Sequence, residues 1–216
     1  MINYLATQKN WQNAFSDTIT SFAELAQALD LPIDSFDSQV GQFPLKVPRR
    51  FVQKMGKGDI NDPLLKQVLP TFQETVQVTG FVTDPLDEQH ANPVKGIIHK
   101  YPSRVLIPVT GACVVNCRYC FRQHFDYHEN LPTQNNWQAI SAYITAHPAV
   151  NEVILSGGDP LSLSNRRLLE IFTTLEALPQ VQTIRIHTRV PVMIPERLDE
   201  PLLARFANSR CHIVMV

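Results

Sequence analysis

Residues 104–120 read RVLIPVTGACVVNCRYC, and the interpretation of the whole chain starts from this stretch. It begins as a short apolar run at 104–109 and continues directly into three cysteines, Cys113, Cys117 and Cys120. An apolar, β-branched run of this length is typical of a buried strand. Folds built from parallel strands place their functional loops at the carboxyl ends of those strands. The stretch therefore predicts a strand that leads into a functional, cysteine-rich loop.

The pattern of the first strand repeats along the rest of the chain. Apolar runs at 152–156, 183–187 and 211–216 are expected to be strands. Helices are expected at about 134–147, 164–178 and 199–208, the second of them capped by Ser164. The resulting βαβαβαβ order predicts an α/β fold with about four parallel strands and right-handed crossovers.

The first hundred residues have a different character. Residues 20–29 start with hydroxyl side chains and carry apolar residues at helical spacing, which predicts a short amphipathic helix. Beyond it, prolines divide the chain into short segments, namely Pro32, Pro44, Pro48, Pro63 and Pro70. We therefore expect an N-terminal cap of short helices and loops over residues 1–100, followed by the α/β region over residues 101–216.

The composition limits the classes of protein to which the chain can belong. Hydrophobic residues make up 44% of the 216 residues and charged residues 18%, which predicts a globular chain with a core rather than a disordered one. The 19 basic and 20 acidic side chains nearly cancel, so we expect no binding to nucleic acid. The start lacks the pattern of a secretion signal, and no apolar run approaches the roughly 20 residues of a membrane helix. We expect a cytoplasmic protein without membrane contact.

The sequence ends inside its last apolar run, at Val216. A strand of that kind without a covering helix is prone to aggregation, so we expect the chain to be the N-terminal part of a longer protein. The alternative is an edge strand that ends the fold.

The three clustered cysteines have the spacing CxxxCxxC, which is compatible with two kinds of metal site. A [4Fe–4S] cluster normally takes four cysteines, so three would leave one iron open to a substrate or cofactor. A structural zinc site is the alternative, with His124 completing a Cys3His ligand set. The fourth cysteine, Cys211, is interpreted as a small buried side chain and not as a ligand.

Several motifs stand out along the chain: YPSRVL at 101–106, the segment CVVNCRYCFRQHF at 113–125, SGGDPL at 156–161 and RIHTRVP at 185–191. VPRRF at 47–51, NDPLL at 61–65 and TDPLDEQH at 83–90 accompany them in the N-terminal region. Together they resemble the radical SAM lysine 2,3-aminomutase family, and the similarity covers essentially the whole chain. It implies that the α/β region is the first part of a (β/α) radical SAM barrel.

The resemblance also implies a role for each site residue. Cys113, Cys117 and Cys120 would bind three irons of a [4Fe–4S] cluster, and S-adenosylmethionine would chelate the fourth. The expected cofactor-binding residues are Tyr119 near the adenine and Gly157, Gly158 and Asp159 near the methionine part. The guanidinium of Arg122 would bind the substrate carboxylate, an anion that matches its geometry.

The activity implied by the resemblance is an isomerisation. A radical formed from S-adenosylmethionine would start migration of the amino group of L-lysine, bound to pyridoxal phosphate, from C2 to C3. The product, (R)-β-lysine, would be attached to elongation factor P by its lysyl-transferring enzyme, and the isomerase could form a homo-oligomer. Alternatives are a structural zinc-binding module and a radical SAM aminomutase acting on another amino acid, such as glutamate.

One departure from the family affects what these residues can do by themselves. The family's pyridoxal-binding lysine and the acidic residues for the distal amine of the substrate correspond to positions beyond Val216. Lys95 and Lys100 match neither, so no catalytic residue is assigned within the chain. We expect the 216 residues to bind a cluster without carrying out the isomerisation alone.

Overall fold

The computed structural model describes residues 11–36, 43–133 and 136–216, which fall into two compact units. The first, called the N-terminal unit, contains Met1–Pro85, Val114–Gln123 and Val192–Glu196. The second, called the sheet unit, contains Leu86–Cys113, His124–Pro191 and Arg197–Val216. The cysteine loop is therefore shared, with Cys113 in the sheet unit and the other two cysteines in the N-terminal unit. The predicted division into regions 1–100 and 101–216 stays a prediction.

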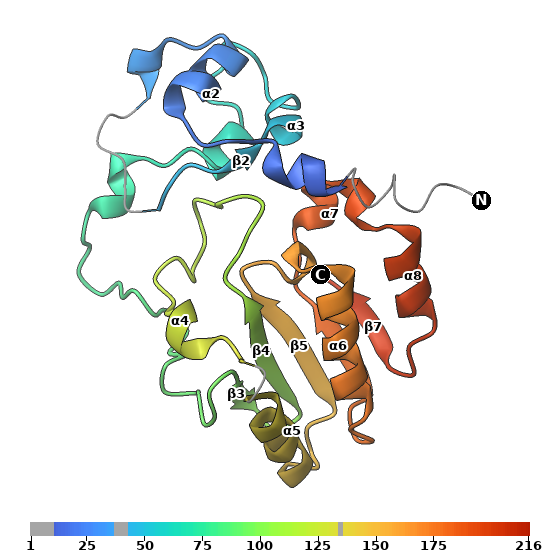
Figure 1. The fold of residues 1–216 in the computed structure, drawn as a ribbon. Coiled ribbons are helices and arrows are strands. Elements are labelled where there is room, and N and C mark those ends of the chain that lie inside the picture. Colours follow the sequence, from blue (N-terminus) through green and yellow to red (C-terminus); the bar gives the residue numbers. More distant parts are fainter. Residues whose placement is uncertain (1–10, 37–42, 134–135) are drawn as a thin grey trace. The chain divides into compact units, whose positions relative to one another are not determined.

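The sheet unit is built on five hydrogen-bonded strands (Figure 1). In spatial order they are β3 (Ile98–Tyr101), β4 (Arg104–Thr110), β5 (Glu152–Gly157), β6 (Thr183–Ile186) and β7 (His212–Met215). From β4 to β7 all neighbours are parallel, which confirms the four predicted parallel strands. The sequence interpretation missed β3, which pairs antiparallel with β4 through a tight hairpin.

The parallel strands are in register along their apolar positions. Val105 on β4 lies opposite Val153, which lies opposite Ile184 on β6, and all three side chains are fully buried. Strand β5 is buried at four consecutive positions, as expected for a central parallel strand covered on both faces. This core fixes where the loops at the carboxyl ends of the strands begin.

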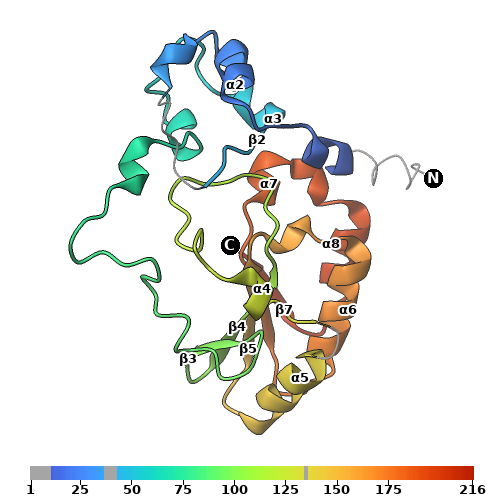
Figure 2. The ribbon, with the colours of Figure 1, turned by 60° about the vertical axis from the view of Figure 1, so that its left-hand side comes forward.

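Three longer helices connect the parallel strands and lie along one face of the sheet (Figure 1 and Figure 2). They are α5 (Asn136–Ala146), α6 (Asn165–Glu176) and α8 (Glu200–Ala207), which confirms the three predicted helices. Positions 134 and 135, where the first was predicted to begin, lie outside the described residues. Ser164 caps the start of helix α6 as predicted, and its hydroxyl accepts a hydrogen bond from the Arg167 backbone N–H at 3.3 Å. Its buried side chains are Leu168, Ile171, Phe172 and Leu175.

The N-terminal unit consists of short elements, which the frequent prolines predict. Residues 11–16 are helical, and helix α2 (Phe22–Leu29) occupies the predicted amphipathic segment. Strands β1 (Thr18–Ile19) and β2 (Val47–Pro48) form a two-residue antiparallel ladder ahead of helix α3 (Arg49–Val52). Among its described residues up to Pro85, the unit also has the 3-10 turns η1 (Ile33–Ser35), η2 (Leu65–Gln67) and η3 (Phe72–Thr75).

The remaining short elements lie in loops that follow strands. Helix α4 (Tyr127–Asn130) follows the cysteine loop, and η4 (Pro160–Ser162) follows β5. Helix α7 (Val190–Met193) and η5 (Pro195–Arg197) come after β6. In the part of the chain that the structure describes, none of the helices has both the length and the apolar character needed to cross a bilayer.

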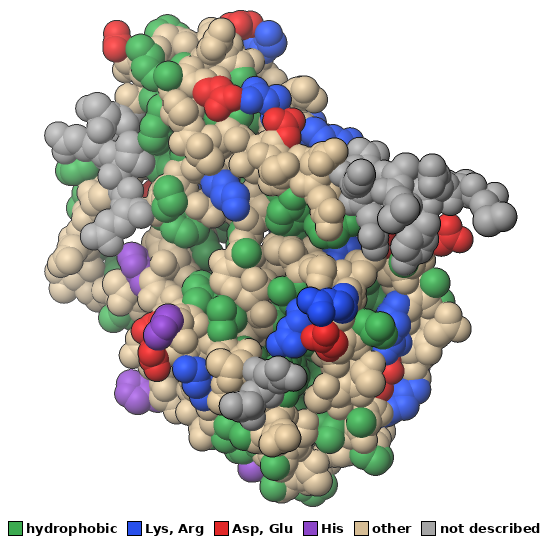
Figure 3. Space-filling model, viewed as in Figure 1, with side chains coloured by type: hydrophobic (Ala, Val, Ile, Leu, Met, Phe, Trp, Pro, Cys, Tyr) green, Lys and Arg blue, Asp and Glu red, His purple; other side chains and the backbone are tan. Residues whose placement is uncertain are grey.

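Charged side chains of both signs are mixed on the face of the molecule drawn in Figure 3. Basic and acidic groups lie close together there instead of forming separate areas of one sign. This mixing agrees with the formal net charge of −1.

Candidate functional site

The loop after β5 holds the start of the cysteine loop in place. The backbone N–H of Gly158 donates a hydrogen bond to the carbonyl of Thr110 at 2.6 Å. The next N–H, that of Asp159, donates to the carbonyl of Ala112 at 2.9 Å. Because Ala112 directly precedes Cys113, these two bonds fix the backbone from which the first cysteine projects.

Gly157 and Gly158 are required by the close approach of the two loops. Gly157 has φ of +111°, and a Cβ there would lie 2.5 Å from the Thr110 carbonyl oxygen. A Cβ on Gly158 would lie 2.4 Å from the carbonyl oxygen of Ala112. The sequence predicts that the glycine pair lets backbone approach a ligand, and in the structure it approaches the backbone of the cysteine loop. Contact of the pair with S-adenosylmethionine stays a prediction.

Asp159 is a buried carboxylate that connects the loops after β5 and β6. Its side chain accepts hydrogen bonds from the Leu161 N–H at 2.9 Å and from the Thr188 hydroxyl at 2.6 Å. It also accepts from the backbone N–H groups of Arg189 at 2.6 Å and Val190 at 3.1 Å. Burial raises the pKa of Asp159, and these four hydrogen bonds oppose that rise. The carboxylate positions the loops, whereas its predicted contact with the cofactor stays untested.

We expect Asp159→Asn to lower the free energy of unfolding by about 2 kcal/mol. Each carboxylate oxygen accepts two of the four hydrogen bonds, and an amide has only one accepting oxygen. Two of the four donors would therefore face an NH2 group and lose their acceptor. Thermal unfolding followed by circular dichroism measures the change. Asp126→Asn is the matched control because Asp126 caps α4 on the surface, and asparagine caps a helix about as well. Equal stability of the two variants would contradict this role of Asp159.

Residues between the first two cysteines attach the loop to the N-terminal unit. Val114 and Val115 are both buried, with exposed fractions of 0% and 4%. The Asn116 side-chain amide donates to the carbonyl of Pro44 at 2.9 Å, and its backbone N–H donates to the carbonyl of Lys46 at 2.9 Å. This half of the loop is therefore held by both packing and hydrogen bonds.

Arg118, between the second and third cysteines, makes a second attachment within the N-terminal unit. Its backbone N–H donates to the carbonyl of Gln67 at 2.8 Å. Its guanidinium forms an ion pair with Glu74 and donates to the hydroxyl of Thr71 at 2.9 Å. A tight turn follows, because the N–H of Cys120 donates to the Cys117 carbonyl at 3.0 Å.

The three loop cysteines provide a donor set that suits an iron–sulfur cluster. All are reduced, partly exposed thiols. Burial raises the pKa of Cys120, while a hydrogen bond from the backbone N–H of Arg122 lowers it. Among the described residues, no three His, Cys, Asp or Glu side chains lie close enough to share one metal ion. In [4Fe–4S] clusters of other proteins, each cysteine thiolate binds a different iron, so the chemistry of these three thiols fits such a cluster.

The structure also locates the other side chains predicted to take part in the site. Tyr119 is 64% exposed. Arg122 is only 7% exposed, and its guanidinium carbon lies 4.6 Å from the centre of the Phe121 ring, so it is not a solvated loop arginine. His124 is exposed and belongs to the sheet unit. The predicted roles of Tyr119 and Arg122 stay predictions.

Cys211 lies apart from this loop, in the segment leading into β7. It is 5% exposed, and its thiol donates to the carbonyl of Val181 at 3.3 Å. Burial raises the pKa of this thiol. The interpretation of Cys211 as a small buried side chain is confirmed.

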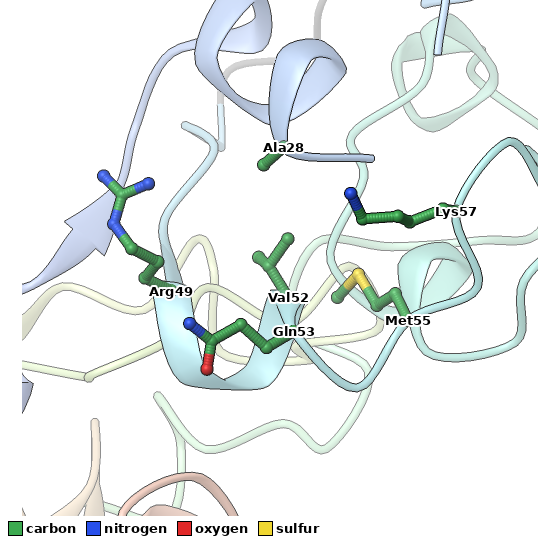
Figure 4. Close-up of a pocket in the computed structure, with 6 residues that line it drawn as sticks. All are labelled: Ala28, Arg49, Val52, Gln53, Met55 and Lys57. Carbon is green, nitrogen blue, oxygen red and sulfur yellow. The ribbon is translucent and has the colours of Figure 1, made fainter. Parts of the chain in front are cut away.

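A pocket of about 500 Å³ lies in the N-terminal unit, away from the predicted site residues in sequence (Figure 4). It is lined by Ala28, Arg49, Val52, Gln53, Met55 and Lys57. Arg49 is paired with Asp17 and Glu24. Lys57 is paired with Asp30 at 3.0 Å, so both cations at this pocket already have acidic partners.

Comparisons with known proteins show which sequences this chain resembles. The sequence profile of the Radical SAM superfamily matches residues 107–216. L-lysine 2,3-aminomutase of Escherichia coli (strain K12) is 44% identical over 214 residues, which are 97% of this chain and 62% of that protein. L-lysine 2,3-aminomutase of Haemophilus influenzae is 43% identical over 212 residues, covering 97% and 63%. The Clostridium subterminale protein of the same name is 32% identical over 203 residues, covering 92% and 49%.

The chain thus spans about three fifths of the length of the first two relatives. The region matched by the superfamily profile begins within β4 and continues through β7. It contains the three clustered cysteines and the glycine loop that supports the first of them. The chain belongs to the radical SAM superfamily.

Proposed function

We propose that this chain is the part of a lysine 2,3-aminomutase that binds the iron–sulfur cluster and S-adenosylmethionine. Membership of the radical SAM superfamily implies both groups. The observation that carries the proposal is the loop of three reduced thiols, Cys113, Cys117 and Cys120, directly after a parallel strand in the matched region. The superfamily match favours this reading over the structural zinc module.

The chain's own residues would divide the work of binding and positioning. The three cysteines would hold the cluster, and the backbone of Gly157 and Gly158 would lie along the methionine part of S-adenosylmethionine. Bound together, the cluster and S-adenosylmethionine supply the radical chemistry of the superfamily. Tyr119 would contact the adenine, and Arg122 would bind the carboxylate of the substrate.

The proposed substrate is L-lysine, which would be converted to (R)-β-lysine. Support comes from relatives named L-lysine 2,3-aminomutase at 44% and 43% identity. The proposal includes pyridoxal phosphate as a second cofactor, use of the product to modify elongation factor P, a cytoplasmic location and homo-oligomer formation. The 216 residues alone are proposed not to isomerise lysine, because neither Lys95 nor Lys100 matches the family's pyridoxal-binding lysine.

Cofactor cleavage and isomerisation can be measured separately to test the proposal. The chain is purified and reconstituted with iron and sulfide without oxygen, then incubated with dithionite and S-adenosylmethionine. We expect 5′-deoxyadenosine and methionine to form, whereas added lysine and pyridoxal phosphate should give no (R)-β-lysine. Absence of cofactor cleavage would contradict the proposed binding function. Formation of (R)-β-lysine would contradict the proposed inactivity of these residues alone.

A further inference from the structure

The segment that carries Cys117 and Cys120 is attached to residues 67–74 by an arginine, whose guanidinium reaches two acceptors at once. The Arg118 guanidinium pairs with Glu74 through Nε and donates through another nitrogen to the Thr71 hydroxyl at 2.9 Å. A planar guanidinium can make both contacts, whereas a lysine ammonium at the same place cannot span them equally well.

Glu74 is itself held in place before it meets the arginine. Its carboxylate accepts a hydrogen bond from the Thr71 backbone N–H at 3.3 Å, and the Thr71 side chain accepts from the Glu74 backbone. This reciprocal pair is a capping box at the start of η3. Arg118 therefore contacts a preorganised acidic group and not a freely moving surface side chain.

The ion pair is also better shielded from water than a similar pair, Arg49 with Glu24, in the N-terminal unit. The side chains of Arg118 and Glu74 are 28% and 17% exposed. Those of Arg49 and Glu24, which form a similar pair in the same unit, are both 40% exposed. Partial burial reduces screening by solvent, so the pair next to the cysteines is the stronger restraint.

We propose that Arg118 is a positioning residue, which holds Cys117 and Cys120 ready for the cluster through its contacts with Glu74 and Thr71. Groups outside the ligand set commonly orient the ligands of a metal site and are needed for tight binding. Here the oriented element is the backbone between the two proposed ligands, because Arg118 lies between them and its own N–H donates to the Gln67 carbonyl. The inference rests on the proposed cluster-binding function.

The positioning role of Arg118 can be tested by measuring cysteine reactivity in the chain without a cluster. The chain is treated with iodoacetamide, and alkylation of each cysteine is followed by mass spectrometry. In Arg118→Ala and in Glu74→Ala, Cys117 and Cys120 should react about fivefold faster than in the wild type, a size typical of a partly shielded ion pair. The double variant should react no faster than either single variant, because both remove the same interaction. Arg118→Lys should fall between wild type and Arg118→Ala.

Two controls separate this restraint from general destabilisation. Glu24→Ala removes the more exposed ion pair of the same unit and should leave the reactivity of Cys117 and Cys120 unchanged. The buried Cys211 should stay slow in every variant unless the sheet unit unfolds. Glu74→Gln keeps an oxygen that can accept from the Thr71 N–H but removes the negative charge. A rise in the reactivity of Cys117 and Cys120 in this variant would show that the ion pair, and not only the capping box, holds the segment.

The outcomes distinguish failure of this inference from failure of the proposed function. Unchanged reactivity in Arg118→Ala, or an equal rise in Glu24→Ala, would overturn the positioning role. After reconstitution, Arg118→Ala should also release iron to a ferrous chelator about fivefold faster than the wild type. A wild-type chain that takes up no iron and sulfide would overturn the cluster function, while the alkylation rates would still report on the restraint.

Discussion

Replacing Cys113, Cys117 or Cys120 with serine, one at a time, is expected to reduce the iron bound after anaerobic reconstitution from about four atoms per chain to fewer than one. Each cysteine would bind a separate iron, and the chain offers only three thiols in this loop. A hydroxyl is a much poorer ligand for iron in such clusters, so loss of one thiol leaves two irons without protein ligands. Iron and acid-labile sulfide analysis gives the result directly.

Cys211→Ser is the matched control for these variants. Its thiol is buried against the Val181 carbonyl in a different part of the chain, so this change should leave iron and sulfide content unchanged. Equal iron loss in Cys211→Ser would show that the effect is not specific to the loop. Full iron content in Cys117→Ser would contradict the assignment of the cluster ligands.

Gly158→Ala is expected to lower the free energy of unfolding by about 3 kcal/mol, or the melting temperature by roughly 10 °C. The added methyl group would lie 2.4 Å from the Ala112 oxygen and 2.8 Å from the backbone carbons of Ala112 and Gly111. Backbone atoms cannot rotate away as a side chain can, so the loop that leads to Cys113 must move. We therefore also expect reduced iron uptake by this variant.

Gly56→Ala provides the comparison for Gly158→Ala. A Cβ on Gly56 would meet its nearest neighbour, a carboxylate oxygen of Asp62, at 3.5 Å, which is ordinary contact. Its melting temperature should therefore stay within a few degrees of that of the wild type, as for most substitutions without steric conflict. A Gly158→Ala protein as stable as Gly56→Ala would contradict the close approach of the two loops.

The parallel sheet could be predicted from sequence because each parallel strand is a short apolar run separated from the next by a stretch of helical length, and the central strand is buried on both faces. Residues 152–156 illustrate this, since four consecutive positions of β5 are buried. Strand β3 was missed for the opposite reason. Its sequence is IHKY, and only Ile98 is buried, so neither alternation nor an apolar run identifies it. Its pairing with β4 depends on a hairpin at the edge of the sheet.

The cysteines of the candidate site could be predicted because their spacing is local, but the groups that support them could not. The capping box at Thr71 and Glu74 has a visible local pattern, yet its pairing with Arg118 depends on how distant segments fold together. Asp159 shows the same limit. Its position after a glycine pair suggests contact with a ligand, and only the structure reveals that four donors from its own loop and the next one surround it.

Electron paramagnetic resonance of the reconstituted, reduced chain, recorded before and after adding S-adenosylmethionine, tests the central claim most directly. Three cysteine ligands leave one iron open, so the account predicts a reduced [4Fe–4S] signal whose shape changes when the cofactor binds. Parallel analysis should give about four irons and matching sulfide per chain. Stoichiometric zinc without sulfide, or a cluster signal that S-adenosylmethionine leaves unchanged, would contradict the account.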